Sequence, residues 1–375
     1  MKFTTLSRAI IFFLLGSWVF VTAGVAQTSA ALSKAKQDAE AKGYIFETSH
    51  DAIVAKAKQE GKLVVLASQD QASINGALEV FRKKYPFIDV KATEIGGTDT
   101  YLRMIKEMVI GQANWDVNYV AFDFYKEYLP HQKKFDLLGM AKHGVLNMPP
   151  EMIDPDNPFV ISLQSNVGAV AYNKKLLPES KVPKSYEDFL KPEFKGRKFA
   201  TDVRPRALAA LVPAWGLEKI VGYAKGLAAQ QPIWTRGDSR TLPFVSGGEV
   251  PLILGLNYKS YMRFKNKRDP QDILGATVLQ PVPVRLTEAE AILGKAKNPY
   301  AALLWLEFQA SPEGQKVLDD TDLAASHLSP DSFHEKATRG KQLSVMGWAD
   351  YENMGNYQKA IVKAFGFPRA DKLKK

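Results

Sequence analysis

The sequence of 375 residues contains no cysteine. Disulfides, thiol nucleophiles, iron–sulfur clusters and thiolate zinc sites all require sulfur, so none of them belongs to this protein. A bound metal would need oxygen or nitrogen ligands. Hydrophobic residues make up 46% of the chain and charged residues 24%, which is ordinary globular composition and excludes disordered and collagen-like classes.

The chain also lacks the short motifs of common enzyme classes. Its five histidines form no HExxH pair, and the sequence contains neither a GxSxG elbow nor a GxxxxGK[ST] phosphate loop. A serine–histidine–acid triad built from distant residues would leave no such motif. We therefore predict no enzyme activity and no resident cofactor, with an exported hydrolase as the alternative from another class.

The chain is basic, with 50 Lys and Arg residues against 40 Asp and Glu residues and a net charge of +10. A positive balance attracts nucleic acid, anionic membranes or small anions. The basic residues are scattered rather than gathered in a stripe with interleaved aromatic residues, so no nucleic acid partner is predicted.

The long apolar run of this sequence lies at the N-terminus. Residues 1–26 have a basic start, an apolar stretch at Ala9–Val21 and small residues at the end, which is typical of a secretory signal peptide. An uncleaved anchor is the alternative, since no charge occurs between Arg8 and Lys34. Cleavage would leave a soluble monomer in the bacterial periplasm, with residues 27–50 as an N-terminal extension.

From residue 51 onward, helix and strand patterns alternate, which predicts an α/β fold with largely parallel sheets. The helical segments include Arg206–Trp215 and Leu217–Ala229. The expected strands are Lys62–Ala67, Ile88–Ala92, Trp115–Val120, Ile161–Tyr172, Lys198–Asp202, Val250–Leu256 and Ala276–Val284.

The proline-rich loop at residues 143–158 and the extended segment after it suggest a boundary between two lobes. We expect residues 51–164 and 285–375, with the C-terminal helices, to form lobe 1. Residues 165–275 would form lobe 2, and residues 276–284 a return hinge strand. Ligands of open α/β sheets bind at the carboxyl ends of strands, so a cleft between the lobes is the expected binding site.

Several segments carry a resemblance to a known family. They include NVGAVAYNKKLLP at residues 166–178, LKPEFKGRKFATD at residues 190–202 and AKNPYAALLWLEFQASPEGQKVL at residues 296–318. The chain resembles periplasmic solute-binding proteins of bacterial ABC importers, in the family 1 branch related to ferric-ion-binding proteins. This resemblance implies a two-lobed type II fold with a hinge and an interlobe cleft. It also implies delivery of a captured solute to an ABC permease in the inner membrane.

In the ferric branch, the resemblance implies adjacent tyrosines, a histidine and a glutamate as metal ligands, together with a bound anion. Here Lys259 follows Tyr258 in place of the second tyrosine, Asp70 stands near the histidine position, and Ala121 stands near the glutamate position. If ferric iron is the transported ligand, Tyr258 and Asp70 are its expected ligands. These departures favour a different solute.

Candidate binding residues in lobe 1 follow the ends of predicted strands. Ser68, Gln69 and Asp70 come after the first strand and offer hydroxyl, amide and carboxylate groups. Gly97 and Thr98 begin a helix whose free N–H groups and dipole favour an anion, although the same residues could simply cap the helix.

The remaining candidates come from lobe 2 and from the crossing segment. Arg204 could bind a carboxylate or phosphate in bidentate fashion, or it could pair with Asp202. Tyr258 follows a strand and is expected in the pocket. The full set of predicted binding residues adds three more to those already named: Asn257, also at the end of that strand, and Ser165 and Asn166 at the hinge.

The sequence therefore predicts a periplasmic receptor that closes two lobes around a small anion or an anionic organic molecule. Ferric iron with a synergistic anion is the alternative solute. A ligand-sensing subunit that contacts a membrane receptor instead of a permease would have the same binding architecture.

Overall fold

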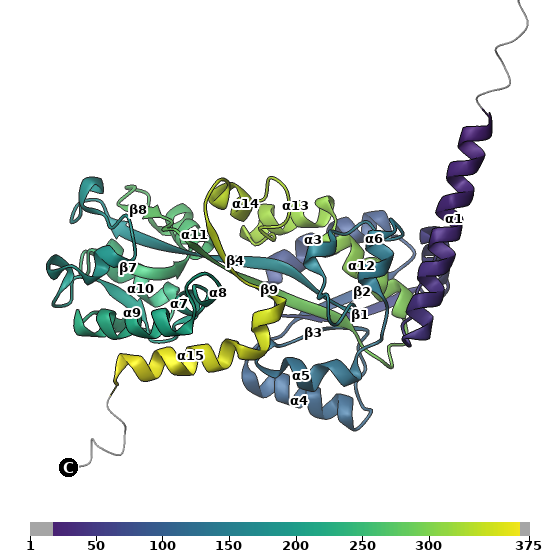
Figure 1. Ribbon diagram of the computed structural model, residues 1–375, viewed down its shortest axis with the longest axis horizontal. Helices are drawn as coiled ribbons and strands as arrows, with labels where there is room; N and C mark the ends of the chain where they lie inside the picture. Colours follow the sequence, from purple (N-terminus) through teal and green to yellow (C-terminus); the bar gives the residue numbers. More distant parts are fainter. Residues whose placement is uncertain (1–17, 368–375) are drawn as a thin grey trace, which may run out of the picture.

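The computed structural model describes residues 18–367, and side chains from residue 30 onward. The predicted signal peptide therefore lies largely outside the described residues. Helix α1 (Trp18–Ala41) begins the described chain and projects from the body of the protein (Figure 1). Within residues 18–367, no helix has the length and apolar character that a membrane span requires.

A ten-stranded sheet forms the framework, in the order β2-β1-β3-β9-β4-β7-β5-β6, with β10 paired to β9 and β8 paired to β4. The pairs β1–β2, β1–β3, β5–β6 and β5–β7 are parallel, as expected for an α/β fold. The strands are β1 (Lys62–Ala67), β2 (Asp89–Glu94), β3 (Val117–Tyr119), β4 (Val160–Asn173), β5 (Ala200–Asp202), β6 (Ile233–Thr235), β7 (Leu252–Asn257), β8 (Leu274–Thr277), β9 (Val282–Ile292) and β10 (Leu343–Met346).

Strands β4 and β9 connect the two lobes (Figure 1). The first half of β4 pairs antiparallel with β9, and its second half pairs with β7 and β8. Lobe 1 is therefore built around β1, β2 and β3, and lobe 2 around β5, β6 and β7. The return strand predicted at residues 276–284 is divided between the end of β8 and the start of β9, with a cis bond between Gln280 and Pro281.

Helices cover both lobes. Those of lobe 1 are α2 (His50–Glu60), α3 (Gln71–Lys84), α4 (Thr98–Val109), α5 (Tyr125–Tyr128), α6 (Leu137–Lys142), α12 (Pro299–Ala310), α13 (Pro312–Asp322) and α14 (Phe333–Thr338). Those of lobe 2 are α7 (Arg206–Ala209), α8 (Val212–Trp215), α9 (Leu217–Ala229), α10 (Asp238–Ser246) and α11 (Tyr258–Arg268), followed later by α15 (Tyr351–Phe365). Short 3-10 turns are η1 (Phe122–Phe124), η2 (Leu129–His131), η3 (Pro150–Met152), η4 (Glu179–Lys181), η5 (Glu187–Leu190), η6 (Pro192–Phe194) and η7 (Trp348–Asp350).

The single helix predicted at residues 206–215 is wrong, because the structure has two short helices there, α7 and α8. Pro213 lies in the first turn of α8. Proline has no N–H to donate to the preceding turn, so it suits the start of a new helix better than the interior of a long one.

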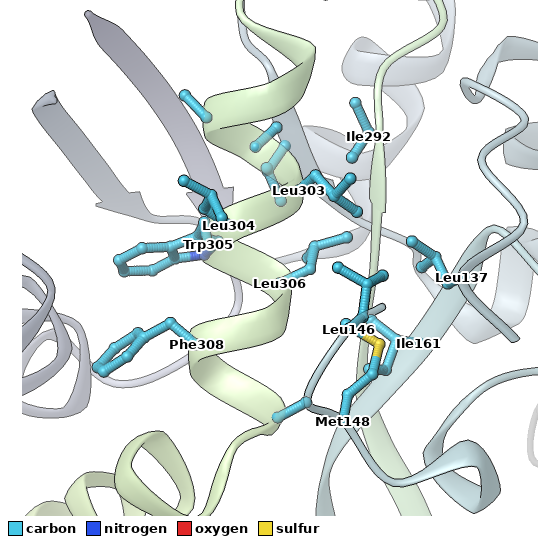
Figure 2. Close-up of a cluster of buried hydrophobic side chains, with 14 of the residues drawn as sticks. Leu137, Leu146, Met148, Ile161, Ile292, Leu303, Leu304, Trp305, Leu306 and Phe308 are labelled. Carbon is cyan, nitrogen blue, oxygen red and sulfur yellow. The ribbon is translucent and has the colours of Figure 1, made fainter. Parts of the chain in front are cut away.

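Helix α12 forms the centre of the lobe 1 core. Its residues from Ala301 to its end are all buried. Figure 2 shows Trp305 and Phe308 on one side of the helix and Leu303 and Leu306 on the other. A helix that is apolar all round must be enclosed by other elements. Helices α2, α3 and α13 and strands β1, β4 and β9 accordingly surround α12.

The C-terminal helices divide between the lobes. Helices α12 and α13 pack against α2 and α3 of lobe 1, whereas α15 packs along α9 of lobe 2 (Figure 1). Tyr351, Met354, Ile361 and Phe365 of α15 belong to the lobe 2 core. The expectation that residues 285–375 belong wholly to lobe 1 is therefore wrong for α15. Apolar spacing shows that a helix has a buried face, but it does not show which lobe covers that face.

Ile361 tests this packing because its side chain is fully buried against lobe 2. The variant Ile361→Ala should lower the free energy of unfolding by about 2–4 kcal/mol, since it leaves a cavity in the core. Chemical denaturation measures the change. Lys359→Ala, at an exposed position of the same helix, is the control and should change stability by less than about 0.5 kcal/mol. Equal stability of both variants would contradict the docking of α15.

Candidate functional site

A pocket of about 520 Å³ lies in lobe 2, where β5 and β7 end and α7, α10 and α11 begin. Three predicted binding residues line it, namely Asp202, Arg204 and Asn257. This position agrees with the general location of ligand sites at the carboxyl ends of strands in α/β sheets.

Basic side chains outnumber acids in the pocket wall. The acids are Asp202 and Asp238, and the basic residues are Arg204, Arg206, Arg263, Lys267 and Arg268. Among residues 30–367, the side chains of Arg206, Lys267 and Arg268 form no ion pair. The pocket therefore carries a positive charge that its own acids do not balance.

Both acids of the pocket accept hydrogen bonds from other residues that line it. Asp202 accepts from Arg204 Nη2 at 3.0 Å and from the Gly237 N–H at 2.9 Å. Asp238 accepts from the N–H and the side-chain amide of Asn257, each at 3.0 Å. The pairing of Arg204 with Asp202 is thus the geometry that the structure shows, and it raises the pKa of Arg204. Burial raises the pKa of Asp238 despite its hydrogen bonds.

Two of the three predicted residues after β1, Ser68 and Gln69, form hydrogen bonds within lobe 1. Ser68 donates from its N–H and its hydroxyl to the two carboxylate oxygens of Glu288, at 2.7 and 2.6 Å. Gln69 donates to Gln309 at 2.7 Å, and Gln309 donates to the buried Glu290 at 3.0 Å. Burial raises the pKa of Glu288 to about 7.

Ion pairs connect the two lobes through α11. Arg263 contacts Asp70 at 3.1 Å and Asp322 at 2.8 Å, and Lys259 contacts the other oxygen of Asp322 at 3.0 Å. Asp322 ends α13 in lobe 1, whereas Lys259 and Arg263 belong to lobe 2. Lys259, which replaces a tyrosine of the ferric pattern, therefore serves as an interlobe contact. Asp70 is likewise engaged by a cation.

Other predicted residues make structural contacts. Tyr258 is not among the residues lining the pocket and stacks on Phe333 with ring centroids 5.0 Å apart. Ser165 bonds His327 Nδ1 at 2.9 Å and accepts from the His327 N–H at 3.1 Å. Gly97 and Thr98 begin α4 in lobe 1 at an exposed position.

The crossing strands carry a second group of polar residues, which are half-buried. Every residue of β4 is buried except Asn166, and every residue of β9 is buried except Arg285 and Thr287. Asn166 lies directly opposite Arg285 in the strand register. The residues predicted from the sequence include Asn166 but not Arg285, although a basic residue within a largely apolar strand is a visible signal.

No cluster of three or more His, Asp or Glu side chains suited to a metal ion occurs in the part of the chain that the structure describes. The two expected ferric ligands have other partners, since Arg263 engages Asp70 and Phe333 packs on Tyr258. These contacts do not favour a metal centre at those two residues.

Two α/β lobes on a shared pair of crossing strands, with a charged pocket at the strand ends, define a solute-binding protein. The sequence profile of bacterial extracellular solute-binding proteins matches residues 123–353. Because the match covers more than half of the chain, the protein belongs to this family. The family is defined by solute binding and not by catalysis.

Solved structures with the same fold include iron-bound HitA from Pseudomonas aeruginosa, at 21% identity and a TM-score of 0.60 over 82% of this chain and 99% of that one. The Trichodesmium protein IdiA (FutA), in complex with iron and citrate, has 17% identity and a TM-score of 0.63, with coverages of 81% and 99%. The substrate-binding protein of an ABC transporter from Agrobacterium tumefaciens has 20% identity and a TM-score of 0.60, with coverages of 81% and 95%. At these identities the likeness establishes the two-lobed fold alone. No curated protein sequence matches the chain.

The interlobe ion pairs give a stability prediction. In Asp322→Asn, the partly buried Lys259 loses its carboxylate, so the free energy of unfolding should fall by about 3 kcal/mol. Asp320→Asn is the matched control, because Asp320 pairs with Lys316 at the exposed surface two residues away. Its cost should be below about 1 kcal/mol. Urea unfolding at neutral pH measures both, and equal effects would show that the interlobe pairs contribute no special stability.

The raised pKa of Glu288 gives a pH prediction. Its folded pKa of about 7 exceeds its ordinary value of 4.5, so folding favours the protonated carboxyl. The stability that Glu288 contributes should therefore fall as pH rises from about 4.5 to 7. Relative to the parent, Glu288→Gln should gain on the order of 1–3 kcal/mol between pH 5 and pH 8. Urea unfolding across that range measures the gain, and a pH-independent difference would refute the assignment.

Proposed function

We propose that the protein is the periplasmic receptor of a bacterial ABC importer and that its solute is a small anion or an anionic organic molecule. Family membership and the two-lobed fold support the receptor role. The Agrobacterium relative, which is a substrate-binding protein of an ABC transporter, supports a permease partner in the inner membrane. The unbalanced positive charge of the lobe 2 pocket carries the proposal for the solute.

The mechanism is closure of the lobes around the solute. The residues that line the pocket all belong to lobe 2, so lobe 1 must supply the opposite wall when the protein closes. Rotation about β4 and β9 would bring that wall into place, and the solute would stabilise the closed state through its higher affinity for it. Arg263 couples solute binding to lobe closure, since it lines the pocket and also contacts Asp70 and Asp322 of lobe 1.

Ferric iron is the second candidate, and the iron-bound relatives support it. A trivalent cation requires negative or phenolate oxygen donors. In this chain, Lys259 and Arg263 occupy the region around the expected ligands Tyr258 and Asp70. This local positive charge favours an anionic solute over iron.

Thermal unfolding of ligand-stripped protein tests the solute class. The panel contains phosphate, phosphonates, small carboxylates, amino acids, polyamines and ferric citrate, with visible absorbance recorded alongside. A bound anion at 100 times its Kd should stabilise the protein by about 2.7 kcal/mol and raise its Tm without colour. Arg206→Gln should reduce that shift, because Arg206 contributes unpaired charge to the pocket wall.

Arg103→Gln is the matched control, since Arg103 is 63% exposed on α4 and outside the pocket. It should bind the anion as the parent does. A shift with ferric citrate accompanied by a charge-transfer band would overturn the anion proposal and restore Tyr258 as a metal ligand. Stabilisation by polyamines alone would also overturn it.

A further inference from the structure

The crossing strands carry three polar residues that are less buried than the rest of these strands. Within β4 and β9, Asn166, Arg285 and Thr287 are half-buried, and the other residues are buried. Residues 285 and 287 lie on the same side of β9, because side chains alternate along a strand. Asn166 stands beside Arg285 on that side, because residues directly opposite in an antiparallel pair share a face.

Arg285 is a partly buried cation without a partner. Among residues 30–367, its guanidinium makes no side-chain hydrogen bond and no ion pair. Asp123 of η1 lies near enough to affect its titration, but it forms no ion pair with it. Burial, together with the positive charge of Arg206, lowers the pKa of Arg285 to about 10. Removing a cation from water without pairing it is costly, so this position suits a ligand that supplies negative charge.

Within the described part of the chain, Asn166 has an unpaired hydrogen-bond acceptor, whereas Arg285 has unpaired donors. Its side-chain oxygen is buried and has no hydrogen-bond donor among the described residues. A guanidinium offers five donors, whereas an amide oxygen offers an acceptor. A solute placed over the pair would therefore satisfy both groups if it had an anionic group next to a hydroxyl or amino group.

We propose that Arg285 and Asn166, which do not line the lobe 2 pocket, form the floor of the solute site in the closed state and select organic anions that carry a hydrogen-bond donor next to the anionic group. The inference rests on the proposed function and narrows its solute class. Arg285 binds the anionic group from the hinge, Arg206 approaches it from lobe 2, and Asn166 accepts from the neighbouring donor. A solute held there contacts the strands about which the lobes rotate.

Isothermal titration with matched probe pairs tests the selection. The pairs are lactate and propionate, citrate and tricarballylate, and glycerol 3-phosphate and propyl phosphate, whose members differ in hydroxyl groups. In at least one pair, the hydroxylated probe should bind the parent protein more tightly. Arg285→Gln should weaken its binding by about 10- to 100-fold, the range expected for losing a charged hydrogen-bond partner. The exposed Arg103→Gln should leave it unchanged.

Two substitutions of Asn166 separate binding from folding. Asn166→Ala should remove the preference for the hydroxylated member of the pair. Asn166→Asp places a carboxylate beside Arg285, so it should pair with the guanidinium, raise the Tm and weaken anion binding by about 10-fold or more. A general folding defect would instead lower the Tm and the affinity together.

The outcomes distinguish this inference from the function on which it rests. If the parent binds a probe and Arg285→Gln binds it equally well, the hinge floor is refuted and the anion receptor stands. If the parent binds inorganic phosphate but no organic probe, the donor requirement is refuted. If the parent binds no anion in this series or in the wider thermal panel, both proposals fail.

Discussion

The antiparallel pairing of β4 and β9 is the constraint on which the rest of the structure depends. Each lobe attaches its parallel strands to a different stretch of this pair, β3 to β9 in lobe 1 and β7 to β4 in lobe 2. A backbone ladder of hydrogen bonds keeps the register of the pair fixed, so motion between the lobes must arise from twisting or bending of these two strands. Residues along the pair are therefore the ones best placed to sense and to limit closure.

Helix α11 contacts the lobe 2 pocket, the interlobe ion pairs and the ring of Phe333. One side of it lines the lobe 2 pocket through Ser260 and Arg263, and Lys259 and Arg263 contact Asp322 of lobe 1. Its first residue, Tyr258, stacks on Phe333 of α14. The same turn of helix thus contacts the pocket and the opposite lobe. Any displacement of α11 by a solute would be transmitted directly to the interlobe contacts.

Local patterns in the sequence located many of the helices and strands but did not identify several of their packing partners. Strand β1 and helix α9 lie where periodicity predicted them, and β4 extends one residue beyond its predicted ends. These signals are local, since alternation and helical spacing depend on neighbouring residues. The placement of α15 on lobe 2 and the contact between Lys259 and Asp322 depend on residues far apart in the chain. No local pattern encodes such pairings, so the site could be located at strand ends but its contacts could not be assigned.

The charges on β9 explain how an anion could reach the hinge despite nearby acids. Glu288 lies three residues from Arg285, and a fully ionised carboxylate there would offset the guanidinium charge. Instead, Ser68 holds the Glu288 carboxyl in lobe 1, and burial raises its pKa to about 7. Glu290, two residues further along, is also buried, and its pKa is raised well above its ordinary value. Around neutral pH these acids carry less than their full negative charge, which reduces the repulsion that they would exert on an anion at Arg285.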